Sequence, residues 1–119
     1  MRVLVTGSRD WTDIDEIRDA LDAHLLALNE VGGYFVLVHG DAKGADQIAH
    51  EWALDLGVEI ERHPYWSKYG LAGGPMRNQH MVNRGADLVL AFIKNESRGA
   101  TGCMEMARKA GLNVEVHRK

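Results

Sequence analysis

Cysteine is almost absent from this chain of 119 residues, in which Cys103 is the only example. One thiol cannot form a disulfide within the chain, and it cannot build a cysteine-based zinc cluster. A chain without disulfides is typical of a reducing compartment, so we expect a cytoplasmic location. No apolar run reaches the length of a membrane span, and the first residues, Met1–Val5, contain no signal-peptide h-region. The sequence therefore predicts neither secretion nor membrane insertion.

An excess of positive charge is also missing. The chain has 14 Lys and Arg residues against 17 Asp and Glu residues, which gives a formal net charge of -3. This balance disfavours a nucleic-acid-binding role, because dedicated nucleic-acid binders carry a basic surface. Hydrophobic residues make up 45% of the chain, as in an ordinary globular protein. We expect a single domain over residues 1–119, too small to contain separate cofactor and substrate domains.

The motifs of the common nucleotide-dependent enzymes are missing too. The turn after Val5 contains no Gly-x-Gly-x-x-Gly, and His39 stands where a dinucleotide-binding dehydrogenase places an acidic residue. Lys43 precedes Gly44, and no Gly-Lys-Ser/Thr follows, so there is no Walker loop. There is no Gly-x-Ser-x-Gly elbow, and the six histidines lack the spacing of metal ligands on a helix. We therefore expect no required cofactor and no metal.

Two apolar runs, each followed by a glycine-containing turn, are the most informative features that are present. Val3–Val5 precedes the turn at 6–9, and Val36–Val38 precedes the glycine-rich segment at 39–46. Continuous runs of valine and leucine are typical of strands that are buried on both faces of a parallel sheet. Glycine just past the end of a strand lets backbone N–H groups approach an anion such as phosphate. The two turns together predict a ligand site.

Strand and helix patterns alternate along the whole chain. Apolar residues at helical spacing predict a helix that begins near Thr12 or Asp13 and ends near Gly32, and a second helix from Ala45 to Gly57. The remaining expected elements are strands at 34–38, 58–61, 86–93 and 114–117, a helix at about 76–84, and a helix that follows the loop at 94–99 and ends at 110. This alternation predicts a Rossmann-like three-layer αβα sandwich around a mostly parallel sheet of roughly five strands.

In such a fold, ligands bind outside the carboxyl ends of the strands. Four loops should therefore meet at one edge of the sheet. They span residues 7–11, 39–46, 63–77 and 94–101. The third is unusually long and aromatic for a small domain, and long connections of this kind are often functional.

The motifs in these loops resemble a known family. They are Val-Thr-Gly-Ser-Arg at 5–9, His-Gly-x-Ala-x-Gly-Ala-Asp at 39–46, His-Pro at 63–64 with Trp66, Gly-Pro-Met-Arg-Asn-x-x-Met at 74–81, and Gly-Ala-Thr at 99–101. Their order is similar to that of the YspA-like, cpYpsA-related branch of the SLOG superfamily, which also includes the DprA/Smf proteins and the LOG-type phosphoribohydrolases. The resemblance implies a nucleotide-binding Rossmann-like domain and, by analogy with LOG enzymes, a homodimer. Members of this branch occur in phages and actinobacteria.

The first two loops supply the candidate phosphate ligands. Arg9 can pair with a phosphate in a bidentate manner, while Ser8 offers a hydroxyl group and both Gly7 and Ser8 offer backbone donors; a solvated surface arginine is the alternative. The second loop contributes Gly40, Gly44, Ala45 and Asp46, where glycine allows close approach. Asp46 can bond a ribose hydroxyl, or it can simply be a first-turn carboxylate that the helix dipole favours.

The third loop contains Gly74, Pro75, Arg77 and Asn78, which should lie at the start of a helix. There both the helix N-terminus and the guanidinium of Arg77 can meet an anion. The Arg-Asn-x-x-Met sequence is similar to the Arg-Lys-x-x-Met signature of LOG enzymes, which implies an active-site role for Arg77. Tyr65 and Trp66 can stack on a base, or they can anchor the connection by packing.

The last loop contributes Gly99 and Thr101, with Thr101 expected to cap the fourth helix and to bond a phosphate. An N-cap without any ligand is the alternative. LOG hydrolases carry Pro-Gly-Gly-x-Gly-Thr-x-x-Glu here, and the glutamate acts on the ribosyl linkage. This chain has Met104 at that position, and Glu105 lies about 100° further round the helix. Glu105 is therefore only a substitute candidate for a catalytic carboxylate, beside Arg77.

Three functions remain open at this point. The first is the binding of a nucleotide or nucleotide-derived small molecule for sensing or sequestration. The second is an N-glycosidase of the LOG type acting on a nucleoside monophosphate or an ADP-ribose-like molecule, with Glu105, Asp46 or Asp41 assisting at the ribose. The third is a DprA-like nucleic-acid or protein interaction, which requires a local patch of Arg9, Lys68, Arg77 and Arg84.

Overall fold

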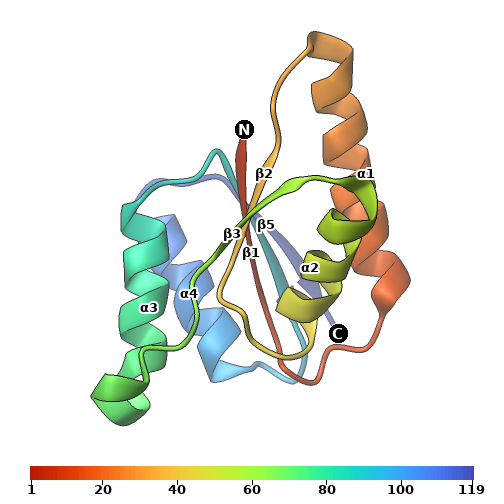
Figure 1. Ribbon diagram of the computed structural model, residues 1–119. Coiled ribbons are helices and arrows are strands. Elements are labelled where there is room, and N and C mark those ends of the chain that lie inside the picture. Colours follow the sequence, from red (N-terminus) through yellow and green to blue (C-terminus); the bar gives the residue numbers. More distant parts are fainter.

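Five strands form one sheet in which every neighbouring pair is parallel, as seen in the computed structural model of residues 1–119 (Figure 1). They are β1 (Arg2–Gly7), β2 (Val36–His39), β3 (Glu59–Arg62), β4 (Leu88–Ile93) and β5 (Val114–Arg118). Their spatial order is β3-β2-β1-β4-β5, so the direction of winding reverses between β1 and β4. The expected Rossmann-like α/β fold is confirmed, and the sheet is parallel throughout.

Four α-helices cover the two faces of this sheet (Figure 1). They are α1 (Ile14–Val31), α2 (Ala45–Leu56), α3 (Gly73–Asn83) and α4 (Arg98–Lys109). Figure 1 shows α1 and α2 on one side of the sheet and α3 and α4 on the other. The carboxyl ends of the strands and the loops that follow them lie at the bottom of this view. None of the helices is long and apolar enough to span a membrane.

Local chemistry explains the ends of the first two helices. Asp13 is the N-cap of α1, because its Oδ1 accepts a hydrogen bond from the backbone N–H of Glu16 at 3.1 Å. Gly32 and Gly57 end α1 and α2 in the left-handed conformation, with φ of 77° and 69°. These boundaries agree with the sequence predictions.

The starts of α3 and α4 differ from the predictions. Helix α3 begins at Gly73 rather than near Met76, so Pro75 lies inside its first turn, where a missing N–H group leaves no intrahelical bond unmade. The preceding residues, Ser67–Ala72, form a 3₁₀ helix. Helix α4 begins at Arg98, and the amide of Thr101 already donates to the Ser97 carbonyl at 2.9 Å. Thr101 is therefore not the N-cap, which corrects the prediction.

The core consists of two apolar layers that the sheet separates. The larger lies between the sheet and α1 and α2, and contains Trp52 and Phe92. Trp11 belongs to it, packing edge-on against Phe92 with ring centroids 5.4 Å apart. A smaller layer under α3 and α4 contains Met81 and Cys103. Both faces of β1 and β4 are buried, as their unbroken apolar sequences predict.

Candidate functional site

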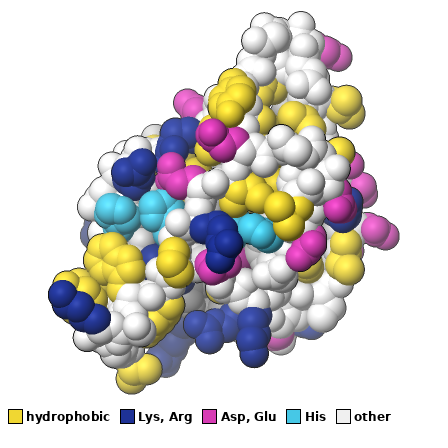
Figure 2. All heavy atoms as spheres, in the orientation of Figure 1, with side chains coloured by type: hydrophobic (Ala, Val, Ile, Leu, Met, Phe, Trp, Pro, Cys, Tyr) yellow, Lys and Arg dark blue, Asp and Glu magenta, His cyan; other side chains and the backbone are white.

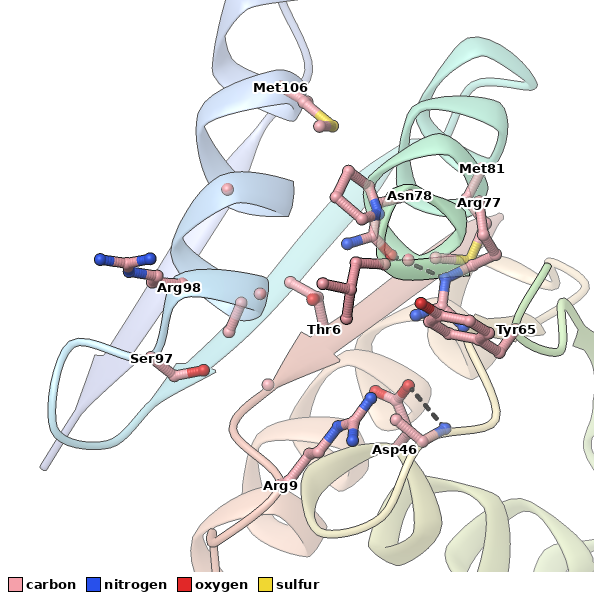
Figure 3. Close-up of a pocket in the computed structure, with 18 of the residues that line it drawn as sticks. Thr6, Arg9, Asp46, Tyr65, Arg77, Asn78, Met81, Ser97, Arg98 and Met106 are labelled. Carbon is pink, nitrogen blue, oxygen red and sulfur yellow. Dashed lines mark hydrogen bonds between the residues drawn. The ribbon is translucent and has the colours of Figure 1, made fainter. Parts of the chain in front are cut away.

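A cavity of about 550 Å³ opens at the carboxyl edge of the sheet, beside the point where the strand order reverses. All four predicted loops contribute to its wall (Figure 3). Its lining comprises Thr6, Gly7, Arg9, Asp10, Ala42, Asp46, Tyr65, Leu71, Gly74, Pro75, Arg77, Asn78, Met81, Ser97, Arg98, Gly99, Ala100, Gly102 and Met106. The position is the one at which parallel α/β sheets bind ligands.

Three of the glycines in the predicted motifs allow the loops to pack against one another. A Cβ atom on Gly7 would lie 2.9 Å from the carbonyl oxygen of Phe92 and would clash with Ala45. A Cβ atom on Gly40 would lie 2.7 Å from the Cζ atom of Arg77. Gly44, with φ of 73°, leaves no room for a side chain beside the backbone of the first turn. Only Gly7 among these three lines the cavity.

Ser8 joins the first turn to the end of β4. Its hydroxyl oxygen accepts from the Lys94 amide at 2.7 Å and donates to the Lys94 carbonyl oxygen at 3.2 Å. Its own amide donates to the Phe92 carbonyl at 2.8 Å, and the side chain is fully buried. The predicted donors of Ser8 are thus used within the protein. Its role is to hold the turn that carries Arg9.

Arg9 and Arg98 are exposed arginines on the cavity wall, and neither forms a hydrogen bond or salt bridge through its side chain. Arg98 is the first residue of α4, where no side chain caps the helix. The first N–H groups of a helix lack intrahelical acceptors, and they carry partial positive charge. The start of α4 with Arg98 can therefore attract an anion, and Arg9 adds a second positive charge on the side of α2, where its backbone meets Gly44. Our sequence interpretation missed Arg98, although it directly precedes Gly99.

Arg77 lines the cavity and forms hydrogen bonds with three segments of the chain. Its Nη1 donates to the carbonyl oxygens of Gly40 and His63, the latter at 3.1 Å, and its Nε donates to Asn78 Oδ1 at 2.8 Å. The side chain is buried, and Nη2 has no partner within the protein. Most of the guanidinium therefore supports the loops, and Nη2 is the part left for a ligand.

Asp46 is a buried carboxyl group on the cavity wall. Its Oδ2 accepts hydrogen bonds from the amide of Gly40 at 3.1 Å and from the amide of Ala42 at 3.3 Å, the second of which is drawn in Figure 3. Its Oδ1 is buried without any hydrogen-bond partner. Burial raises the pKa of Asp46 to about 7, against the opposing effects of the two amides and of Arg77. The residue thus orders the second loop with one oxygen and leaves the other unused.

Only one of the two residues predicted to stack on a base lines the cavity. Tyr65 lines the cavity, and its hydroxyl group donates to the Gly70 carbonyl. Trp66 does not line the cavity; it packs against His80 and Tyr69, with ring centroids 5.3 and 5.9 Å away. The packing alternative therefore applies to Trp66. Tyr65 remains available for an aromatic ligand.

The remaining predicted residues also divide into two groups. Gly74, Pro75, Asn78 and Gly99 line the cavity. Ala45, Thr101 and Glu105 do not: Ala45 is fully buried under β1, and Glu105 is exposed on the outer surface of α4. Met104, which replaces the LOG glutamate, is buried in the core.

Helix α4 faces the cavity with residues that the sequence interpretation did not identify. Gly99, Gly102 and Met106 recur at helical spacing, and all three line the cavity. Gly102 and Met106 were not among the predicted site residues. The spacing of Gly99 and Gly102 could have indicated that both lie on one face of a helix. That interpretation requires the helix to begin at Arg98, whereas the sequence predicted a loop up to Gly99.

Comparison with known proteins agrees with this architecture. A family model described as the YspA, cpYpsA-related SLOG family matches residues 1–69. The Gene 61 protein of Mycobacterium phage D29 is 44% identical over 119 residues, which cover 95% of this chain and 93% of that protein. The family match includes the first two glycine-containing loops. The similarity to the phage protein extends over nearly the whole chain.

Proposed function

The chain belongs to the YspA, cpYpsA-related SLOG family, and we propose from this premise that it is a cytoplasmic protein that binds a nucleotide or nucleotide-derived small molecule. Binding serves sensing or sequestration of the ligand and requires no metal. The observation that carries the proposal is a cavity lined by two arginines without protein partners, Arg98 at the free N-terminus of α4 and Arg9 on the side of α2.

The cavity lining combines cationic and apolar side chains, which supports a ligand with an anionic and an aromatic part. Arg98 and the first N–H groups of α4 favour phosphate at the start of that helix, and Arg9 adds positive charge on the side of α2. Tyr65, Pro75 and Met106 are apolar lining residues that a base can contact. Figure 2 shows Lys and Arg side chains gathered at the lower edge of the molecule, below the loops, whereas charges of both signs mix elsewhere on this face.

The test is a binding screen with a chromatographic readout. Nucleoside monophosphates, NAD, ADP-ribose and cyclic nucleotides are each incubated with the protein, and the melting temperature and the release of free base are measured. We expect at least one nucleotide to raise the melting temperature, and Arg98→Ala to weaken its binding about tenfold or more, because one charge-assisted contact is lost. Arg108→Ala, on α4 but outside the cavity, is the matched control and should bind normally.

The same screen separates binding from hydrolysis. Glu105 lies outside the cavity, whereas Asp46 is a cavity carboxyl group with a raised pKa, which favours Asp46 as the acid or base of any N-glycosidase. Release of base that Asp46→Ala abolishes would replace the binding proposal by the hydrolase. A thermal shift without turnover would leave binding as the function.

A nucleic-acid role finds less support in the arrangement of the charges. Arg77 is buried, and Arg84 lies 3.4 Å from Glu61, so these two arginines do not form an open basic patch with Arg9 and Lys68. If single-stranded oligonucleotides stabilise the protein and no mononucleotide does, small-molecule binding is wrong.

We also propose that the protein is a homodimer. Leu71 is 96% exposed on the rim of the cavity, and Met76 is exposed nearby on α3. Exposed apolar side chains of this kind favour a partner surface. Light scattering should give twice the monomer mass, and Leu71→Glu should shift the protein toward the monomer. A monomeric wild-type protein would contradict the proposal.

A further inference from the structure

Gly99 and Gly102 are two glycines in α4 that the fold itself does not require. Both have φ values outside the left-handed region, and a Cβ atom added at either position would meet no atom within 4 Å. Glycine in a helix is less stable than alanine, so an alanine would suit both positions better in a protein without a ligand. Since both glycines line the cavity, they leave a strip of bare helix backbone facing it.

Asp46 is a second unfavourable feature on the wall of the same cavity. Asp46 is only 5% exposed, and its Oδ1 has no hydrogen-bond partner. A buried acceptor without a donor destabilises a fold, whereas a ligand that supplies the donor removes this penalty. Figure 3 shows Asp46 and Arg98 on opposite sides of the end of β1, with Thr6 between them. The cavity thus has an unused acceptor on the side of α2 and bare backbone on the side of α4.

We propose that the cavity holds a sugar with free hydroxyl groups between Asp46 Oδ1 and the Gly99–Gly102 strip of α4. This inference rests on the nucleotide binding proposed above, and it narrows the ligand class to ribonucleotides with unmodified 2′ and 3′ hydroxyl groups. A sugar hydroxyl donates to Oδ1, which is an acceptor when Asp46 is ionised. The bare strip lets the sugar ring lie against the helix, where a Cβ atom at position 102 would occupy part of the space.

The structure offers a conservative variant for this contact. In Asp46→Asn, the amide oxygen can still accept from the backbone N–H groups of Gly40 and Ala42, which keeps the second loop in place. The amide nitrogen then stands where Oδ1 stood and presents a donor in place of an acceptor. The variant therefore changes the chemistry of the contact without emptying the site.

The experiment compares AMP and GMP with their 2′,3′-dideoxy forms by isothermal titration calorimetry. For the wild-type protein, we expect the better of the two ribonucleotides to bind at least about tenfold more tightly than its dideoxy form, because the latter leaves Asp46 Oδ1 unpaired. Asp46→Asn should reduce this ratio to about one. Gly102→Ala should weaken binding of the ribonucleotide while raising the melting temperature of the unliganded protein. Glu105→Ala, on the outer surface of α4, is the control. It should change neither the affinity for the ribonucleotide nor the ratio of ribonucleotide to dideoxynucleotide affinity.

The outcomes separate this inference from the proposed function. If ribonucleotides and dideoxynucleotides bind the wild-type protein equally well, the sugar contact is wrong, although nucleotide binding stands. The sugar contact is also wrong if Asp46→Asn still prefers ribonucleotides to dideoxynucleotides, or if Gly102→Ala binds the ribonucleotide with the affinity of the wild-type protein. If no nucleotide in the full screen binds, the proposed function fails and the sugar contact fails with it.

Discussion

At the scale of single residues, the candidate site contains polar groups that the fold leaves without partners. Asp46 has a buried oxygen without a hydrogen-bond partner, which reduces the stability of the empty protein. Arg9 and Arg98 are exposed arginines that line the same cavity and pair with no protein group. Unused polar groups of this kind are concentrated at functional sites, because ligand binding requires them and folding does not. Arg77 differs, since its hydrogen bonds to two loops serve the fold as well.

Asp46 should make the stability of the protein depend on pH. Its folded pKa of about 7 lies above the ordinary value of 3.8, so the folded state holds the proton more tightly than the unfolded state. Stability should therefore be greatest at low pH with respect to this group, and it should fall as pH rises through about 7. Arg77 and Asp41 are the charged groups that act on it besides the two backbone amides.

Asp46→Asn removes this titration. We expect the variant to gain stability relative to wild type between about pH 5.5 and about pH 8.5, by at least about 1 kcal/mol, since one pKa unit corresponds to about 1.4 kcal/mol. Urea denaturation of both proteins at the two pH values measures the difference. A constant difference across this range would show that Asp46 does not titrate there.

At the scale of elements, the loops that follow the strands support one another directly. Ser8 joins β1 to β4 through hydrogen bonds that span 86 residues of sequence, and Arg77 of α3 reaches the loop after β2. These contacts require glycine. At Gly7 and Gly44 two backbones approach closely, and at Gly40 the backbone approaches the guanidinium of Arg77. The cavity is therefore shaped by contacts between loops rather than by any one motif.

Gly40→Ala tests this interlocking. The new Cβ atom would lie 2.7 Å from Arg77 Cζ, so the guanidinium would have to move away from the carbonyl groups that it binds. We expect a loss of stability of about 1–3 kcal/mol, measured from the urea midpoint. Gly99→Ala is the control, because its Cβ atom meets no neighbour within 4 Å. Equal stability of Gly40→Ala and wild type would contradict this account.

At the scale of the whole molecule, one ionic cluster links parts of the fold that no strand pairing connects. Glu61 of β3 accepts two hydrogen bonds of 2.9 Å from Arg2 of β1, across the intervening β2. It also binds His63 at 2.7 Å and Arg84, which follows α3, at 3.4 Å. These partners, Arg2 foremost, lower the pKa of Glu61 far below its ordinary value.

Glu61→Gln should therefore destabilise the protein at neutral pH. A group with a depressed folded pKa contributes stability above its unfolded pKa of 4.5, and this contribution is lost as pH falls toward the folded value. We expect a loss of about 1–2 kcal/mol at about pH 7, since charge-assisted hydrogen bonds are replaced by neutral ones. The gap between variant and wild type in thermal denaturation should narrow below pH 4.5. An equal gap at neutral pH and well below pH 4.5 would contradict the role of the charge.

Much of the fold was predictable because its signals are local. The unbroken apolar run of β1 indicates a strand buried on both faces. Asp13 begins α1, and Gly32 and Gly57 end α1 and α2, each through interactions with neighbouring residues. The start of α3 was not predictable in the same way. Gly73, Gly74 and Pro75 are typical of a turn, yet they form the first turn of α3, where Gly73 packs closely against the Trp66 backbone.

The sequence by itself determined the Rossmann-like topology and the edge of the sheet at which the loops meet, because hydrophobic periodicity and strand direction are properties of neighbouring residues. Only the tertiary structure decided which side chains face the cavity. Ser8 turns inward to Lys94, Trp66 turns away to His80, and Arg98 and Gly102 join the wall. The orientations of Ser8 and Trp66 depend on contacts between residues that are distant in sequence, which no local pattern records. Gly102 alone had a local signal, its helical spacing from Gly99, and that signal depended on where α4 begins.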